Sequence, residues 1–138
     1  MSARPTPEQI RDLMPFAQAL GIELLETTAD QVLGRLAYAP ERCTTNGLMH
    51  GGAMLALADT CGGVLAFLNM PEGATGTATI ESKTNFLRAV TEGAVTATTK
   101  PLHVGRTLAV VETELTRDDG KLAAKVSQTQ AFHYPRQG

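Results

Sequence analysis

The most constraining feature of the chain is a long uncharged segment that contains a single acid. From Ala53 to Leu68 the sequence reads AMLALADTCGGVLAFL, and Asp59 is its only ionisable carboxylate. A segment that is apolar on nearly all sides predicts a helix wrapped by other elements. Burying a carboxylate there costs several kcal/mol unless it is paired, hydrogen-bonded or opens onto a polar site. Asp59 is therefore the first candidate for a functional residue.

The segments around this helix predict an antiparallel sheet. Residues 21–39 predict two strands and residues 75–135 predict four more, with a hairpin signal at Asp119-Gly120. A short N-terminal helix is expected over about residues 6–19, because Thr6-Pro7 has the pattern of a helix start. A sheet curled around one central helix satisfies this order, so the fold class is α+β in a single domain, 1–138.

The bulk composition excludes several classes of protein. The net charge is −2 over 138 residues, so no global field attracts nucleic acid. The run 53–68 is shorter than the about 20 apolar residues that a bilayer requires, and the N-terminus lacks the apolar core of a signal peptide. Cys43 and Cys61 suggest no disulfide framework, and the three histidines share no metal-ligand spacing. We therefore expect a soluble cytoplasmic protein with no metal and no nucleic-acid or membrane partner.

The start of the long helix carries a second chemical feature, the sequence His50-Gly51-Gly52. A helix N-terminus offers unpaired backbone N–H groups and about half a positive charge to a carbonyl oxygen that becomes an oxyanion. Asp59 follows Gly51 by eight residues, or about 12 Å along a helix, too far for both to touch one reacting carbon within a subunit. Antiparallel helices across a two-fold axis would instead bring Asp59 of one subunit to face Gly51 of the other.

The strings NGLMHGGAMLALADTCGG and TNFLRA resemble the hotdog-fold acyl-CoA thioesterases of the PaaI-like group. The resemblance covers nearly the whole chain and implies a hotdog fold, an antiparallel sheet wrapped around one long central helix. It implies that the Gly51 amide polarises the thioester carbonyl, with Asp59 of the neighbouring subunit as nucleophile or general base. A hydroxyl residue on the strand after the helix assists the acid in similar proteins. Thr79 is the best match for it, and Thr77 is the second.

The resemblance also suggests residues that position water or hold coenzyme A. Similar proteins often place Asn or Gln about six residues before the His, where this chain has Thr44 and a nearby Asn46. Whether Thr44 or Asn46 positions the water stays open. His50 is placed among the catalytic residues, where it is expected to shape the start of the helix. Gly52 and Thr77 are expected to contact the substrate. The residues expected near the phosphates of coenzyme A are Arg88, His103, Gly105 and Arg106.

Together these features predict hydrolysis of an acyl- or aroyl-CoA thioester by a homodimer or a dimer-of-dimers tetramer. No separate cofactor is expected, because coenzyme A is part of the substrate. A noncatalytic acyl-CoA-binding or sensing domain is the alternative, in which Asp59 would not be needed for turnover. A hotdog hydratase or dehydratase is a third possibility. Those enzymes generally pair a His with an acid, and His50 does not occupy that arrangement.

Overall fold

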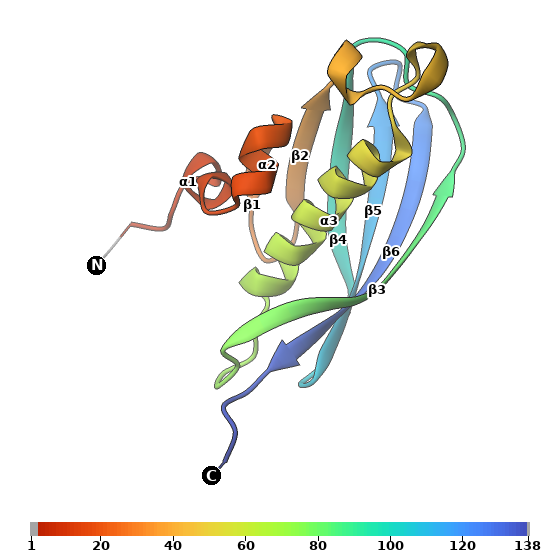
Figure 1. Cartoon of the computed structure of the whole chain (residues 1–138). Coiled ribbons are helices and arrows are strands. Elements are labelled where there is room, and N and C mark those ends of the chain that lie inside the picture. The colour runs from red at the N-terminus through yellow and green to blue at the C-terminus, as the bar shows by residue number, and fades with distance from the viewer. Residues whose placement is uncertain (1–2, 138) are drawn as a thin grey trace.

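A six-stranded antiparallel sheet and one long helix, α3 (Gly51–Leu68), form the centre of the chain in the computed structural model, which describes residues 3–137 (Figure 1). The strand order is β1-β2-β4-β5-β6-β3, so β1 and β3 are the two edges. This is the α+β hotdog arrangement that the sequence predicts. The strands are β1 Glu23–Thr27, β2 Val32–Ala37, β3 Gly76–Phe86, β4 Ala94–Val104, β5 Leu108–Arg117 and β6 Leu122–His133.

The sheet covers only one side of α3, which differs from the prediction of a helix wrapped on all sides. Leu57, Cys61 and Leu65 are fully buried in the core. On the opposite side, Asp59 and Phe67 are exposed. The prediction that Asp59 is buried is therefore wrong for the single subunit. The helix crosses one face of the sheet (Figure 1), and the two strands that contact Asp59, β3 and β6, leave it exposed in the single subunit.

By length and composition alone, α3 could cross a membrane, since its 18 residues have a mean hydropathy of 1.6. In the fold it is instead the central helix on the sheet, and 44% of it is buried. Its apolar character therefore reflects its place in the hydrophobic core.

The N-terminal helix predicted over about residues 6–19 is two short helices, α1 (Pro7–Asp12) and α2 (Pro15–Leu20). The start of α1 is as predicted, because Thr6 caps it in a capping box with Gln9. The break has a clear cause in Pro15. Proline lacks the N–H that would continue α1, and the residue before it is forced out of helical geometry.

The connection from β2 to α3 contains two single 3₁₀ turns, η1 (Pro40–Arg42) and η2 (Thr45–Gly47). Arg42 fixes it in place: its guanidinium donates to the carbonyls of Leu20 and Ala37 at 2.7 and 3.0 Å. Its own carbonyl accepts the His50 N–H at 2.8 Å. These bonds hold the residue immediately before the helix and so set the direction in which α3 begins.

Candidate active site

The histidine before α3 is its N-cap. His50 Nδ1 accepts the backbone N–H of Gly52 at 2.7 Å, so a neutral His50 ring carries its proton on Nε2. A Cβ added to Gly52 would lie 2.8 Å from that Nδ1, which explains why glycine follows here. Gly52 is expected near the substrate, but its backbone N–H is already bonded to His50 and is not free for a substrate oxygen.

The neighbouring Gly51 amide has no hydrogen-bond acceptor among residues 3–137. As the first residue of the helix it cannot bond within α3, and helix N-termini favour developing negative charge. Its N–H is therefore available to an external carbonyl oxygen.

A cavity of about 440 Å³ lies beside this amide. Its walls include Gly51, Thr44, Phe86 and Arg88. The Phe86 ring would be only 3.0 Å from a Cβ on Gly51, so the glycine permits this packing. Of the two residues proposed to position water, Thr44 lines the cavity and Asn46 does not. Asn46 has a left-handed backbone with φ of 63°, a conformation that Asn adopts more readily than most residues.

The carboxylate of Asp59 is held by two side chains from the sheet. Thr79 Oγ1 donates to Asp59 Oδ1 at 3.2 Å, and Gln128 Nε2 donates to the same oxygen at 3.4 Å. Gln130 Nε2 in turn donates to Thr79 Oγ1 at 2.7 Å. The predicted contact between Thr79 and the acid is present, whereas Thr77 makes no bond to Asp59 among the described residues.

Asp59 opens onto a second cavity, of about 650 Å³. Thr77, Thr79 and Gln130 form its polar side together with the acid. The other walls are mostly apolar side chains from α1, α2 and the second half of α3. Such a cavity suits an apolar group whose reacting end lies at the carboxylate.

Gly51 and Asp59 thus belong to different cavities, and no residue lines both. The helix between them is continuous, so their separation is about 12 Å at 1.5 Å per residue. A single subunit therefore presents the amide and the acid apart, as the spacing in the sequence predicts.

A family model of the thioesterase superfamily matches residues 46–124. The chain belongs to the thioesterase superfamily. ComA2 of Bacillus subtilis (strain 168), which carries an esterase name, is 34% identical over 93 residues, 67% of this chain and 74% of that protein. The crystal structure of the thioesterase HI1161 from Haemophilus influenzae has a TM-score of 0.88 at 26% identity, and the match covers 96% of this chain and 93% of that one.

A further likeness concerns the fold alone. A thioesterase-named protein of Streptococcus pneumoniae, crystallised with coenzyme A, has a TM-score of 0.74 at 22% identity, and the match covers 84% of this chain and 88% of that one. The comparisons make the chain a hydrolase of the thioesterase superfamily with the hotdog fold.

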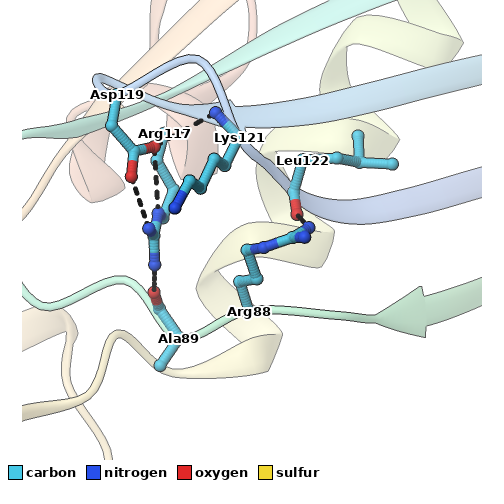
Figure 2. Close-up of polar contacts among 6 residues, drawn as sticks. All are labelled: Arg88, Ala89, Arg117, Asp119, Lys121 and Leu122. Carbon is cyan, nitrogen blue, oxygen red and sulfur yellow. Dashed lines mark hydrogen bonds and ion pairs between the residues drawn. The ribbon is translucent and has the colours of Figure 1, made fainter.

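Arg88 places a positive charge beside the Gly51 cavity of this thioesterase. The residue follows β3 by two positions, and its guanidinium donates to the Leu122 carbonyl at 2.8 Å (Figure 2). No described carboxylate pairs with it, so its charge is available to an anion.

Arg117, from the adjacent β5–β6 hairpin, is already paired. Its guanidinium binds Asp119 and also donates to the Ala89 carbonyl at 3.0 Å (Figure 2). The hydrogen bonds from Arg117 and from the Lys121 backbone lower the pKa of Asp119 to about 2. The same pairing with Asp119 raises the pKa of Arg117. The Asp119-Gly120 hairpin predicted from the sequence is present, and this ion pair joins the end of β5 to its turn.

The other predicted coenzyme A residues lie at the opposite end of the sheet. His103 ends β4 with Val104, and Gly105 and Arg106 form the turn into β5. Thr107 in this turn accepts the Phe132 N–H, beside the first residues of β3, whereas Phe86 at the end of β3 lies at Gly51. An extended strand of 11 residues spans roughly 33 Å. Arg88 and Arg106 of one subunit therefore do not share a phosphate.

The two buried glutamines were not identified from the sequence. Gln128 and Gln130 are only 1% exposed, on strand β6. The signal was present, because both alternate with the buried positions Val126 and Phe132 along the segment VSQTQAF, and residues two apart share a face of a strand. Polar side chains at core positions of this kind are candidates for a site.

The buried Cys61 thiol is not suited to act as a nucleophile. Burial raises its pKa to about 12, so it stays protonated at neutral pH. It packs against Gly34, where an added Cβ would lie 2.5 Å from its sulfur. No group of three or more His, Cys, Asp or Glu residues able to hold a metal ion exists within residues 3–137.

Proposed function

We propose that the protein hydrolyses an acyl- or aroyl-CoA thioester to a carboxylic acid and free coenzyme A. The observation that carries this proposal is the setting of Asp59. The acid has two sheet donors on one carboxylate oxygen and faces a cavity with mostly apolar walls. That combination suits a reacting carbonyl with an apolar acyl or aryl group.

We propose that two subunits build each site. Strand β3 is an 11-residue edge of the sheet, and its free backbone groups can pair with the β3 edge of a second copy. A two-fold axis there sets two α3 helices antiparallel, with Asp59 facing Gly51 of the partner subunit. The exposed side of α3 is then covered by the partner. A homodimer is the minimal unit, and a dimer of dimers is its natural extension.

In this site the amide and the acid act on the same carbonyl. The N–H of the partner subunit's Gly51 and the dipole of its helix stabilise the oxyanion that forms as the carbonyl carbon is attacked. In one route an Asp59 oxygen is the nucleophile: the C–S bond breaks, the coenzyme A thiolate leaves, and water then hydrolyses the mixed anhydride. In the other route Asp59 takes a proton from the water that attacks, and the same thiolate leaves. Thr79 holds the acid in both.

The coenzyme A part of the substrate would lie on the Gly51 side. The Arg88 guanidinium lies beside this cavity without a carboxylate partner among residues 3–137, and guanidinium groups bind phosphate through charge-assisted hydrogen bonds. The S. pneumoniae fold neighbour crystallised with coenzyme A supports this class of ligand. The turn with His103, Gly105 and Arg106 could contact the nucleotide end of the same substrate only if it came from the subunit that does not supply Arg88.

The test is release of free thiol from a panel of aromatic and aliphatic acyl-CoA thioesters, with Asp59→Asn measured beside the parent protein. We expect hydrolysis by the parent and a loss of about 10²-fold or more in the variant, because an amide neither attacks nor takes a proton. Coenzyme A binding by the variant should be retained. Binding without hydrolysis of any thioester by the parent would instead support the noncatalytic acyl-CoA-binding domain.

A further inference from the structure

Two buried glutamines make their side-chain hydrogen bonds at the candidate active site. Gln128 and Gln130 are each 1% exposed and lie two residues apart on β6, so both face α3. The only other buried polar residues of the described core, Thr99 and Thr113, bond to each other at 2.7 Å. A buried amide without a partner is costly. The glutamines therefore need an explanation that the threonine pair does not.

Both glutamines support one carboxylate oxygen, Gln128 directly and Gln130 through the Thr79 hydroxyl. Gln130 Nε2 occupies an acceptor site of the Thr79 hydroxyl, so the hydroxyl proton points to Asp59 Oδ1. Gln128 Nε2 approaches the same Oδ1 directly. The other oxygen, Oδ2, has no protein donor among residues 3–137. The arrangement thus distinguishes the two oxygens of one carboxylate.

The helix makes room for one of these amides. A Cβ on Gly62 would lie 1.8 Å from Gln128 Oε1, while a Cβ on the adjacent Gly63 would meet nothing within 4 Å. Gln128 Oε1 itself has no hydrogen-bond partner among the described residues. Packing of the core alone does not explain why a helix would carry a glycine here, beside an amide oxygen that has no partner among the described residues. The space at Gly62 keeps the Gln128 amide within reach of Asp59.

We infer that Gln128 and Gln130 are positioning residues, which fix Asp59 through Oδ1 so that Oδ2 is presented to the reacting carbonyl or water. Gln128 acts on Asp59 directly, and Gln130 acts through Thr79. This inference rests on the proposed role of Asp59 in hydrolysis. It adds two residues that act on the reaction through that acid, of which Gln130 also lines the cavity at Asp59 and Gln128 does not.

The test replaces each amide with an apolar side chain of similar size, as Gln128→Met and Gln130→Met. We expect each change to lower kcat roughly 10- to 100-fold, because support of the charged Asp59 is lost directly or through Thr79. KM should change by less than about twofold in Gln128→Met, because Gln128 does not line the cavity at Asp59, whereas Gln130 does. In a Thr79→Val background, Gln130→Met should cost no further activity, since its route to Asp59 is already cut. The control is Thr113→Val, which disrupts the other buried polar pair and should leave kcat unchanged.

A second variant and a spectroscopic readout separate failure of this inference from failure of the proposed function. Gly62→Ala displaces the Gln128 amide by crowding and should lower kcat to a similar degree, even where Gln128→Met folds poorly. The NMR signal of the Asp59 carboxyl carbon should shift in Gln128→Met but not in Thr113→Val, whether or not a substrate is known. An unchanged signal together with an unchanged kcat in both Gln128→Met and Gly62→Ala overturns the inference, even if Asp59→Asn is inactive. A shifted signal in a protein that hydrolyses no thioester supports the positioning contact and counts against the proposed function alone.

Discussion

The Thr79 hydroxyl and the Asp59 carboxylate are joined by a 3.2 Å hydrogen bond between edge strand β3 and helix α3. This bond ties the acid to the strand that offers the free edge of the sheet. Pairing of a second subunit along that edge would therefore place the partner's helix next to a carboxylate that is already oriented. The position of the acid and the proposed assembly follow from the same element.

Removal of the Gly51 N–H should impair catalysis without unfolding the protein. Proline at this first helical position lacks the amide and is well tolerated there, and His50 already has φ of −63° and ψ of 132°, which suit a residue before proline. We expect Gly51→Pro to lower kcat by about 10²- to 10³-fold, the loss typical of one oxyanion donor. Gly51→Ala is the matched control in steady-state kinetics, since it adds the Cβ and keeps the N–H. Equal losses in the two variants would mean that crowding against Phe86 is responsible.

The His50 cap should contribute to stability. His50→Ala removes the acceptor of the Gly52 N–H, and loss of an N-cap costs about 1 kcal/mol. Urea denaturation should show a lower midpoint with an unchanged slope. Gly52→Ala should have a similar effect, because its Cβ would displace the His50 ring. A midpoint equal to that of the parent protein in both variants would show that the cap is not used.

The ion pair between Arg117 and Asp119 predicts a pH dependence at the β5–β6 hairpin. Its hydrogen bonds lower the pKa of Asp119 in the folded protein to about 2, below its usual value of 3.8. The contribution of the pair to folding is therefore fully present above about pH 4 and is lost as the pH falls through about 2. NMR titration should show Asp119 ionised at pH 3 in the parent protein. A titration midpoint near 3.8, or one unchanged in Arg117→Met, would contradict this.

The sequence was sufficient for the central helix and for the spacing of the two proposed site residues on it. The apolar run and the His50-Gly51-Gly52 start predict α3, and helical geometry alone shows that Gly51 and Asp59 cannot meet within one subunit. The hairpin at Asp119-Gly120 is likewise confirmed, because the turn chemistry is local. Features that depend on spacings of a few residues were therefore predictable.

Features that depend on the tertiary arrangement were not. An apolar helix predicts burial, but which side the sheet leaves open depends on the strand order, so Asp59 is exposed in one subunit. Gln128 lies 69 positions after Asp59, and no local pattern links them. The distance between Arg88 and Arg106 likewise follows from the register of β3 and β6. Pro15 indicates a helix break from the sequence alone, so the prediction of one continuous N-terminal helix missed a local signal.

The most direct test of the shared site is complementation between two inactive variants. Asp59→Asn lacks the acid and Gly51→Pro lacks the amide, so each homodimer should be nearly inactive. Subunits mixed after reversible dissociation form hetero-dimers in which one of two sites has both groups intact. Random mixing in equal amounts should therefore restore about one quarter of the parent activity in the thiol-release assay. No recovery, with mass spectrometry confirming that hetero-dimers had formed, would contradict a site built from Asp59 of one subunit and Gly51 of the other.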